Sequence, residues 1–201
     1  MVTVDTRFYD AKKAAKEEGM ARKESITSQM ILDVAFQMAR EEGLSGITAR
    51  RVAERANCST QPIFRSFQNM DDLVDGVYER AISFFQDYYA LYPKLEKAPF
   101  CNLGLAYVAF AREERELFRM LFVPERSGKS LYEILNGPSE NVKGEIQRAA
   151  AWGCKDPGAL FMKIWIFIHG AACMSMTGDY DLSDQETKVM LENVCTSFMQ
   201  E

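Results

Sequence analysis

The chain has 201 residues, of which 47% are hydrophobic and 26% are charged, and its formal net charge is −5. This composition is typical of a folded globular protein and excludes an intrinsically disordered chain. No apolar run reaches the roughly 18 residues that a membrane-spanning helix needs, and the charged N-terminus lacks the apolar segment of a signal peptide. We therefore expect a cytoplasmic protein with no membrane partner.

Charge is unevenly distributed along the sequence. Residues 1–67 contain 11 Lys and Arg against 9 Asp and Glu, a net of +2, whereas residues 68–201 contain 13 against 20, a net of −7. A weakly basic N-terminal part followed by an acidic part is typical of a small nucleic-acid-binding domain attached to a larger body.

The first predicted elements are helices. Apolar residues recur at steps of three and four from residue 26 onward, which predicts a helix that Ser25 caps and Gly43 ends. A short second helix is predicted at about 48–56. Asn69 then caps a long helix that ends before Pro93.

Helical periodicity continues to the C-terminus, interrupted by segments that contain proline and glycine. No stretch alternates long enough to predict a strand, so the chain is predicted to be all-α, with about eight to ten helices. The later helices are placed at about 99–112, 114–122, 139–152, 157–176 and 184–199, the last one opening with the capping box SDQE.

The stretch TARRVAERANCSTQPIFRSF, residues 48–67, has the pattern of a helix-turn-helix. Thr48 caps the first helix, and Asn57 in the turn is one of the few residues other than glycine that tolerate a positive φ. Ser59 is predicted to cap the second helix, in whose first turn Pro62 is tolerated. Such an element presents its second helix to the major groove of DNA.

The second helix has an inner and an outer face. Ile63 and Phe67 are predicted to face the protein interior. We expect Arg50 and Arg51, on the first helix, to reach the phosphate backbone of DNA. The outer face of the second helix consists of Thr60, Gln61, Phe64, Arg65 and Ser66.

The sequence GLSGITARRVAERANCSTQPIFRSFQNMDDLVDGVYE resembles the N-terminal domain of the TetR family of bacterial transcriptional regulators, over about residues 26–80. WIFIHG, residues 165–170, is similar to a motif in the regulatory domain of one TetR subgroup. The resemblance implies a homodimer whose two heads each place residues 60–67 in a major groove. It also implies a helical body that dimerises through its last two long helices and holds an effector pocket.

The resemblance also implies roles for individual residues. Thr48 is expected to contact phosphate, Gln61 and Arg65 are candidates for base edges, and Phe64 takes the position of the family's usual tyrosine. The candidate DNA-binding residues are Thr48, Arg50, Arg51, Ser59, Thr60, Gln61, Pro62, Phe64, Arg65 and Ser66.

Four residues depart from the family pattern. Phe64 lacks the tyrosine hydroxyl, Ser66 replaces the common histidine and Met70 stands where a lysine usually begins the next helix. Asn57 replaces the usual glycine. An alternative therefore stays open, namely a helical small-molecule-binding or partner-binding protein with weakened operator recognition.

The fold class expected from these features is all-α, with an N-terminal three-helix head and a helical C-terminal body for ligand binding and dimerisation. The expected domains are an N-terminal extension (1–23), a helix-turn-helix DNA-binding domain (24–69) and a regulatory and dimerisation domain (70–201). Lys12, Lys13 and Lys16 in the extension suggest an extra phosphate-contacting arm, but neighbouring glutamates fit a solvated surface equally well.

Large apolar side chains are concentrated between residues 84 and 122 and again in the helix at 157–176. Most are expected to form the core, because aromatic and methionine side chains at helical spacing usually pack together. With the family resemblance, some are expected to line a site for a small, largely apolar effector. The candidate ligand-binding residues are Phe85, Tyr89, Tyr107, Phe110, Phe118, Phe122, Trp165 and His169.

The sequence contains no catalytic or metal-binding pattern. His169 is the single histidine, and the five cysteines include no C-x-x-C pair, so we expect buried reduced thiols and no metal, cofactor or catalytic residue. The segment SGKS, 127–130, lacks the glycine that a phosphate-binding loop needs at position 123. Gly170 and the two alanines after it favour close helix packing, either within the chain or in a dimer.

The sequence therefore predicts a ligand-responsive transcriptional regulator and not an enzyme. The predicted partners are double-stranded operator DNA of palindromic sequence, a small-molecule effector that releases it, and a second copy of the chain.

Overall fold

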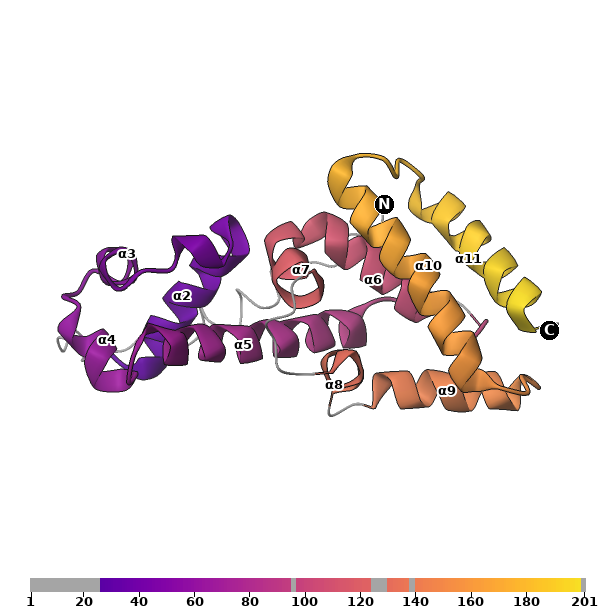
Figure 1. Cartoon of the computed structure of the whole chain (residues 1–201), viewed down its shortest axis with the longest axis horizontal. Coiled ribbons are helices and arrows are strands. Elements are labelled where there is room, and N and C mark those ends of the chain that lie inside the picture. The colour runs from indigo at the N-terminus through magenta and orange to yellow at the C-terminus, as the bar shows by residue number, and fades with distance from the viewer. Residues whose placement is uncertain (1–25, 95–96, 124–129, 138–139, 200–201) are drawn as a thin grey trace.

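A computed structural model describes residues 26–94, 97–123, 130–137 and 140–199 (Figure 1). Over these residues the regular structure consists of ten α-helices, α2 to α11, and one short 3-10 helix. The prediction of an all-α fold is confirmed. The predicted N-terminal arm with its lysine cluster lies outside the described residues. Below, residues 26–69 are called the head and residues 70–199 the body.

The head consists of α2 (Ser28–Glu42), the 3-10 helix η1 (Leu44–Gly46), α3 (Ala49–Arg55) and α4 (Gln61–Ser66). The prediction that Ser25 caps α2 is wrong: the N-cap is Thr27, whose hydroxyl accepts a hydrogen bond from the Met30 amide at 3.2 Å. Thr27 has an extended backbone, which lets its hydroxyl meet a free amide of the first turn. The prediction for Gly43 is confirmed, since it ends α2 with φ at 76°.

Helix α5 (Met70–Leu91) runs from the head into the body (Figure 1). Asn69 caps it as predicted and accepts a hydrogen bond from the Asp72 amide at 2.9 Å. The 22 residues of α5 span roughly 33 Å at the rise of an α-helix, so this helix joins the two parts of the molecule mechanically.

The body contains α6 (Cys101–Glu113), α7 (Arg115–Phe122), α8 (Leu131–Asn136), α9 (Asn141–Ala151), α10 (Pro157–Thr177) and α11 (Asp184–Met199). Helix α6 is central, and α10 and α11 lie against it (Figure 1). Gly104 permits this close approach, because a Cβ there would lie 3.0 Å from the side chains of Ile168 and Leu191. The three helices therefore share one core.

Helix α8 was not predicted. It begins with a capping box in which the Ser130 hydroxyl accepts from the Glu133 amide and the Glu133 carboxylate accepts from the Ser130 amide. The S-x-x-E pattern of this capping box, Ser130 to Glu133, is visible in the sequence and predicts the start of the helix.

Candidate DNA-binding and effector sites

The turn between α3 and α4 has the backbone that the sequence predicted. Asn57 has φ at 51°, in the left-handed region, and the next amide, that of Cys58, donates to Ala53 O at 2.9 Å. The prediction that Ser59 caps α4 is wrong, because the N-cap is Thr60 and its side chain makes no capping hydrogen bond. The backbone of Thr60 is already helical, and its carbonyl accepts from the Ile63 amide at 3.1 Å.

Helix α4 separates an inner face from an outer face as expected. Ile63 is fully buried and Phe67 packs against the core, whereas Gln61, Phe64 and Arg65 are exposed. Phe64 is 54% exposed, which is unusual for a large aromatic side chain at the outer end of the head. The exposed face of α4 is therefore available to a partner.

The arginines of the head differ in their surroundings. Arg51 donates to the Glu42 carboxylate at 2.6 Å and to the Gly46 carbonyl at 3.1 Å. Within the part of the chain that the structure describes, Arg50 and Arg65 have no ion-pair partner. Arg51 thus holds α3 against α2, while Arg50 and Arg65 keep their charge toward solvent.

Seven of the eight candidate effector residues form one ring cluster, to which α5, α6, α7 and α10 contribute. Tyr107 lies at its centre and is fully buried. Its ring centroid lies 4.8 to 6.2 Å from the rings of Phe85, Phe118, Phe122, Trp165 and His169. Phe110 joins through Phe85, with the centroids 5.0 Å apart.

The ring cluster contains one polar pair. The Tyr107 hydroxyl lies 3.0 Å from Nδ1 of His169, and the other ring nitrogen, Nε2, lies 3.6 Å from the Cys173 sulfur. Burial lowers the pKa of His169 and raises the pKa of Tyr107 well above its usual value. At neutral pH the pair is uncharged, so it offers hydrogen bonds without a charge.

Tyr89 lies outside the ring cluster. Its hydroxyl donates to the Glu145 carboxylate at 3.3 Å, and the Lys94 ammonium lies 3.1 Å from its ring centroid. Burial lowers the pKa of Lys94 to about 8. The structure thus places Tyr89 in a separate polar cluster where α5 ends.

The head contacts the body through an ion pair that the sequence did not reveal. Arg40 of α2 donates from Nε and Nη2 to both oxygens of Glu114, at 2.7 and 2.5 Å. Glu114 stands at the junction of α6 and α7 and is 5% exposed. The rings of Tyr107 and Phe118 lie on these same two helices, so the ion pair connects the ring cluster to the head.

The outer face of α10 is apolar and exposed. On α10, Met162, Ile166 and Met174 are exposed, Ile166 by 69%. They share one stripe with Gly170, where a Cβ would meet open space. We call these four residues the α10 stripe. By length and composition α10 could cross a membrane, which is weak evidence when a single helix of the described chain has this property.

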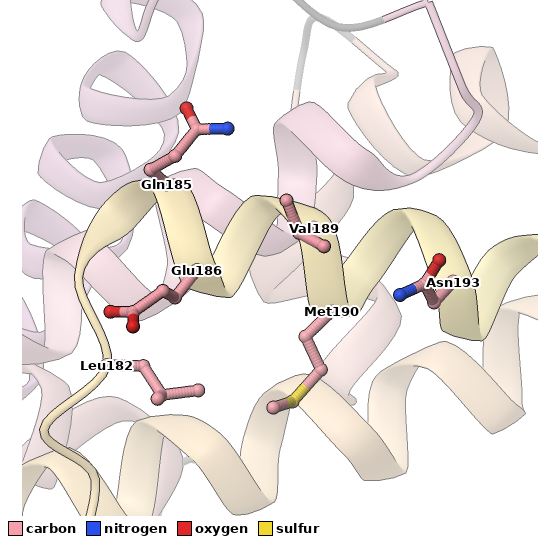
Figure 2. Close-up of a pocket in the computed structure, with 6 residues that line it drawn as sticks. All are labelled: Leu182, Gln185, Glu186, Val189, Met190 and Asn193. Atoms are coloured by element: carbon pink, nitrogen blue, oxygen red, sulfur yellow. The ribbon is translucent and has the colours of Figure 1, made fainter.

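A shallow groove of about 340 Å³ lies beside α11 (Figure 2). It is mostly apolar, and Val189, one of the residues that line it, is 46% exposed. Its lining residues are Leu182, Gln185, Glu186, Val189, Met190 and Asn193.

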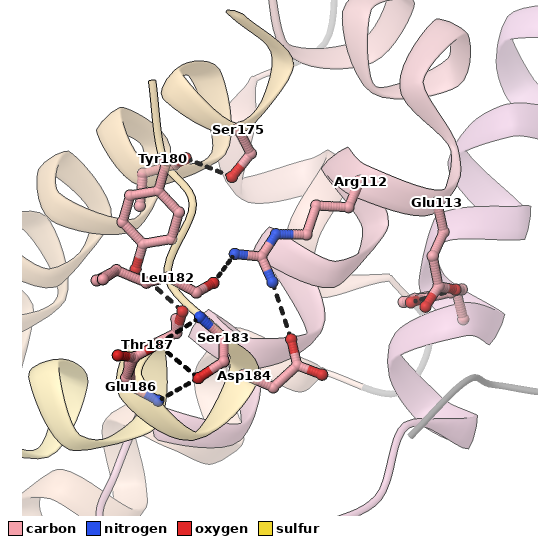
Figure 3. A network of polar contacts seen from close by, with 11 residues as sticks. Arg112, Glu113, Ser175, Tyr180, Leu182, Ser183, Asp184, Glu186 and Thr187 are labelled. Atoms are coloured by element: carbon pink, nitrogen blue, oxygen red, sulfur yellow. Dashed lines mark hydrogen bonds and ion pairs between the residues drawn. The ribbon is translucent and has the colours of Figure 1, made fainter. Parts of the chain in front are cut away.

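Arg112 fixes the connection between α10 and α11 to α6 (Figure 3). Its guanidinium donates to the Asp184 carboxylate at 2.9 Å and to the Leu182 carbonyl at 2.6 Å. The predicted capping box of α11 is present, with the Ser183 amide donating to Glu186 at 2.8 Å. These bonds orient α11 beside α10.

No group of three His, Cys, Asp or Glu that could hold a metal ion occurs in the described part of the chain. The ring cluster, the exposed face of α4, the α10 stripe and the groove beside α11 are therefore the features that a function must explain.

Comparison with known proteins identifies the family. The model of the bacterial regulatory proteins of the tetR family matches residues 31–77, and that of the tetracyclin repressor-like C-terminal domain matches residues 100–198. The uncharacterized HTH-type transcriptional regulator YvkB of Bacillus subtilis (strain 168) is 39% identical over 51 residues. That match covers 25% of this chain and 27% of YvkB, about a quarter of each.

Two solved structures show the same fold over nearly their whole length. A TetR-like transcriptional regulator from Rhodococcus sp. RHA1 has a TM-score of 0.60 at 13% identity, covering 90% of this chain and 99% of that one. A TetR protein from Acinetobacter baumannii AYE in complex with minocycline has a TM-score of 0.56 at 15% identity, covering 88% and 98%. The N-terminal family model matches the head and the C-terminal family model matches the body of the same chain. This protein is therefore a TetR family transcriptional regulator, a helix-turn-helix DNA-binding protein and not an enzyme.

Proposed function

We propose that the protein is a cytoplasmic repressor that binds a palindromic operator as a homodimer and is released by a small, largely apolar effector. In this proposal residues 24–69 bind DNA, residues 70–201 bind the effector and dimerise, and residues 1–23 extend the DNA-binding domain. The observation that carries it is the arrangement of α4, which buries Ile63 and exposes Gln61, Phe64 and Arg65.

Two features of the head support DNA binding. The exposed face of α4 offers an amide and a guanidinium, the groups that pair with adenine and guanine edges in the major groove. Thr48 is exposed at the start of α3, and Arg50 is exposed beside it, so both can approach phosphates. Arg51 contributes by holding α3 in place through Glu42 and Gly46.

Binding to the DNA upstream of the protein's own gene tests the proposal, measured by fluorescence anisotropy over a range of salt concentrations. Arg65→Ala is expected to reduce discrimination between operator and random DNA by about 1–3 kcal/mol, roughly 5-fold to 150-fold. The matched control is Lys143→Ala, which removes the same charge from α9 at the far end of the body (Figure 1).

Equal losses in the two variants would contradict base recognition by Arg65. Salt-insensitive or absent binding by the wild-type protein would contradict the repressor and favour the second candidate, a helical small-molecule- or partner-binding protein. Phe64 favours that candidate, because a half-exposed ring without a hydroxyl offers no hydrogen bond to phosphate.

The proposed dimer is supported by the α10 stripe and the groove beside α11. A soluble protein rarely leaves Met162, Ile166 and Met174 uncovered on one continuous face, and a second copy of α10 would cover them. Two-fold symmetry would then place the heads on two half-sites of a palindrome.

Ile166→Glu tests the dimer by placing a charge in the centre of the α10 stripe. Light scattering after size-exclusion chromatography is expected to show a monomer. The control, Leu91→Glu, introduces the same charge at a side chain that is exposed at the end of α5. Dimers in both variants would contradict the proposed interface.

The ion pair between Arg40 and Glu114 supports a route from effector to DNA. An effector that separates the Tyr107 and Phe118 rings would shift α6 against α7, and Glu114 stands at their junction. Arg40 would carry this shift to α2, against which α3 and α4 pack. The neutral Tyr107–His169 pair favours an uncharged effector that has one polar group.

Thermal-shift screening with neutral aromatic compounds tests this route, and minocycline is included because the related Acinetobacter protein was solved with it. A compound that stabilises the wild-type protein is expected to release DNA. In Glu114→Gln the same compound is expected to stabilise the protein equally but to release DNA less. Undiminished release would contradict the route.

A further inference from the structure

Two buried cysteines lie in contact between α6 and α11. Cys101 is the first residue of α6, Cys195 lies near the end of α11, and their sulfur atoms are 3.9 Å apart. Both side chains are buried, at 0% and 2% exposure. The other cysteines, Cys58, Cys154 and Cys173, are only partly buried. The chain therefore brings together two thiols that are 94 residues apart in sequence.

The position of Cys101 is fixed by its neighbours. The preceding residue, Phe100, has φ at 63°, a left-handed conformation that is unfavourable for a bulky side chain. It is held there because its amide donates to the buried Glu145 carboxylate at 2.5 Å. The backbone that leads into α6 is thus constrained, and Cys101 faces α11 from a defined place.

The position of Cys195 is fixed as well, and its thiol is polarised. Cys195 donates to the Pro99 carbonyl at 3.4 Å. The hydrogen bond from Cys101 lowers the pKa of Cys195, while burial and the carboxylates of Glu145 and Glu192 oppose this shift. A lowered pKa increases the thiolate fraction, and the thiolate is the form that oxidants attack. Cys195 lies one turn from the end of α11, whereas Cys101 is fully buried at the start of α6, so Cys195 is the thiol that peroxide reaches first and Cys101 is the resolving thiol.

We propose that Cys101 and Cys195 are a redox-active pair that forms an intramolecular disulfide when a peroxide oxidises the protein. The Cys195 thiol loses its proton and the thiolate attacks one peroxide oxygen; the O–O bond breaks, the leaving hydroxide takes up that proton as water, and Cys195 becomes a sulfenic acid. The Cys101 sulfur then attacks the Cys195 sulfur, and water leaves with the Cys101 proton. Overall the two thiols lose two electrons and two protons, and hydrogen peroxide becomes two molecules of water.

The disulfide requires a limited movement. Its sulfur atoms must approach from 3.9 Å to about 2.05 Å, which side-chain rotation and a small shift of α11 provide. Peroxide reaches Cys195 only when the last turn of α11, which packs on the core through Phe198, opens. The bond would tie α11, the helix that lines the groove in Figure 2, to the N-terminus of α6. This inference does not depend on the proposed DNA-binding function.

A variant that keeps only the buried pair tests the proposal: Cys58→Ser, Cys154→Ser and Cys173→Ser combined in the full chain. It is treated with hydrogen peroxide, quenched and denatured, and its thiols are counted and its mass measured. Both thiols are expected to disappear with a loss of two hydrogen atoms, to return with dithiothreitol, and to leave the chain uncrosslinked to a second copy. The melting temperature is expected to rise by roughly 10 °C on oxidation, since the bond closes a long loop.

Single replacements in this background separate the two steps. With Cys101→Ser, the Cys195 sulfenic acid is expected to persist and to react with dimedone; with Cys195→Ser, the Cys101 thiol is expected to remain unreacted. The proposed redox pair would be overturned if both thiols stayed intact at peroxide doses that oxidise Cys173 in the wild-type chain. It would also be overturned if Cys195 were converted directly to sulfinic acid, or if the disulfide formed between two chains. If the disulfide lowered the melting temperature, the claim that it ties α11 to the N-terminus of α6 would be overturned.

Discussion

The head and the body are organised by different interactions. In the head, helices of six to fifteen residues begin and end through local contacts, such as the Thr48 hydroxyl that accepts from the Arg51 amide at 3.3 Å. In the body, rings such as Phe85, Tyr107 and Trp165 pack across helices that are far apart in sequence. The head therefore exposes its candidate DNA-binding side chains on a locally determined frame, whereas the body buries most of its aromatic rings between helices.

This difference has a consequence for mutations. A change on the outer face of the head should affect binding more than stability, because few contacts are lost. A change in the ring cluster should affect stability first, because many contacts depend on each ring. Each of the following experiments tests this division, from the largest expected effect to the smallest.

Two phenylalanines give the sharpest test. Phe118→Ala removes a fully buried ring that lies 5.2 Å from Tyr107 and 5.1 Å from Phe122, and it is expected to lower the free energy of unfolding by about 4 kcal/mol. Phe64→Ala is expected to change stability by less than about 0.5 kcal/mol. In the proposed complex it removes apolar contact with thymine methyl groups, and not a phosphate hydrogen bond, so it is expected to weaken DNA binding. Urea denaturation and anisotropy measure the two effects. Comparable losses of stability would break the division between head and body.

The contact between head and body is the next test. Glu114→Ala leaves the Arg40 guanidinium without its carboxylate at a nearly buried site, and stability is expected to fall by about 3 kcal/mol. The control is Glu116→Ala two residues later, which breaks an exposed ion pair with Arg119 and should cost less than about 1 kcal/mol. Equal costs would show that the buried ion pair does not hold the head on the body.

A smaller effect tests the local frame of the head. Asn57→Ala places a residue without a polar side chain at φ of 51°, and it is expected to cost about 1 kcal/mol. Asn57→Gly should be neutral or slightly stabilising, since glycine adopts this φ without strain. Thermal denaturation checks both variants. A loss of stability with glycine would show that the asparagine side chain, and not its backbone, matters.

The smallest predicted effect concerns pH. Burial raises the pKa of Glu113, and the neighbouring carboxylates of Glu114 and Asp184 raise it further, while the hydrogen bond from Tyr88 at 2.9 Å opposes them. The folded state therefore binds the proton more tightly than the unfolded state. Its contribution to stability is present below the unfolded pKa and is lost as pH rises through the folded pKa.

Glu113→Gln keeps an oxygen for Tyr88 and removes the charge, so the melting temperature at pH 7 is expected to rise by about 1–2 °C. The gain should disappear in acid. Glu186→Gln is the opposite control, because hydrogen bonds from Ser183 lower the pKa of Glu186, so its loss should destabilise at pH 7 and have no effect in acid. A gain for Glu113→Gln that persists in acid would contradict the assignment.

Much of the head could be predicted from the sequence, because its determinants are local. The left-handed Asn57, the Thr48 cap and the outward face of α4 all follow from residue types within one turn of each other. The two errors, at Ser25 and Ser59, occurred where a second hydroxyl residue, Thr27 or Thr60, follows within two positions and takes the cap position. Backbone angles, which the sequence does not specify, decide between them.

The body could be predicted only in part. Helical periodicity located its long helices, and the family resemblance brought seven of the eight candidate rings together. Tyr89 was grouped with them because it is aromatic, but its contacts are with Glu145 and Lys94. The pairs Arg40–Glu114 and Cys101–Cys195 join residues that are 74 and 94 positions apart in sequence. A local sequence pattern therefore does not predict either contact.

The exposed α10 stripe makes the stability of this protein in the cell depend on its concentration. A newly made subunit without a partner exposes Ile166 and its neighbours, the kind of surface that chaperones and proteases recognise. In the proposed dimer a second α10 covers that surface, and assembly depends on subunit concentration. In the proposed dimer, operator occupancy would therefore rise more steeply than the supply of subunits, and surplus single subunits would be removed by proteolysis.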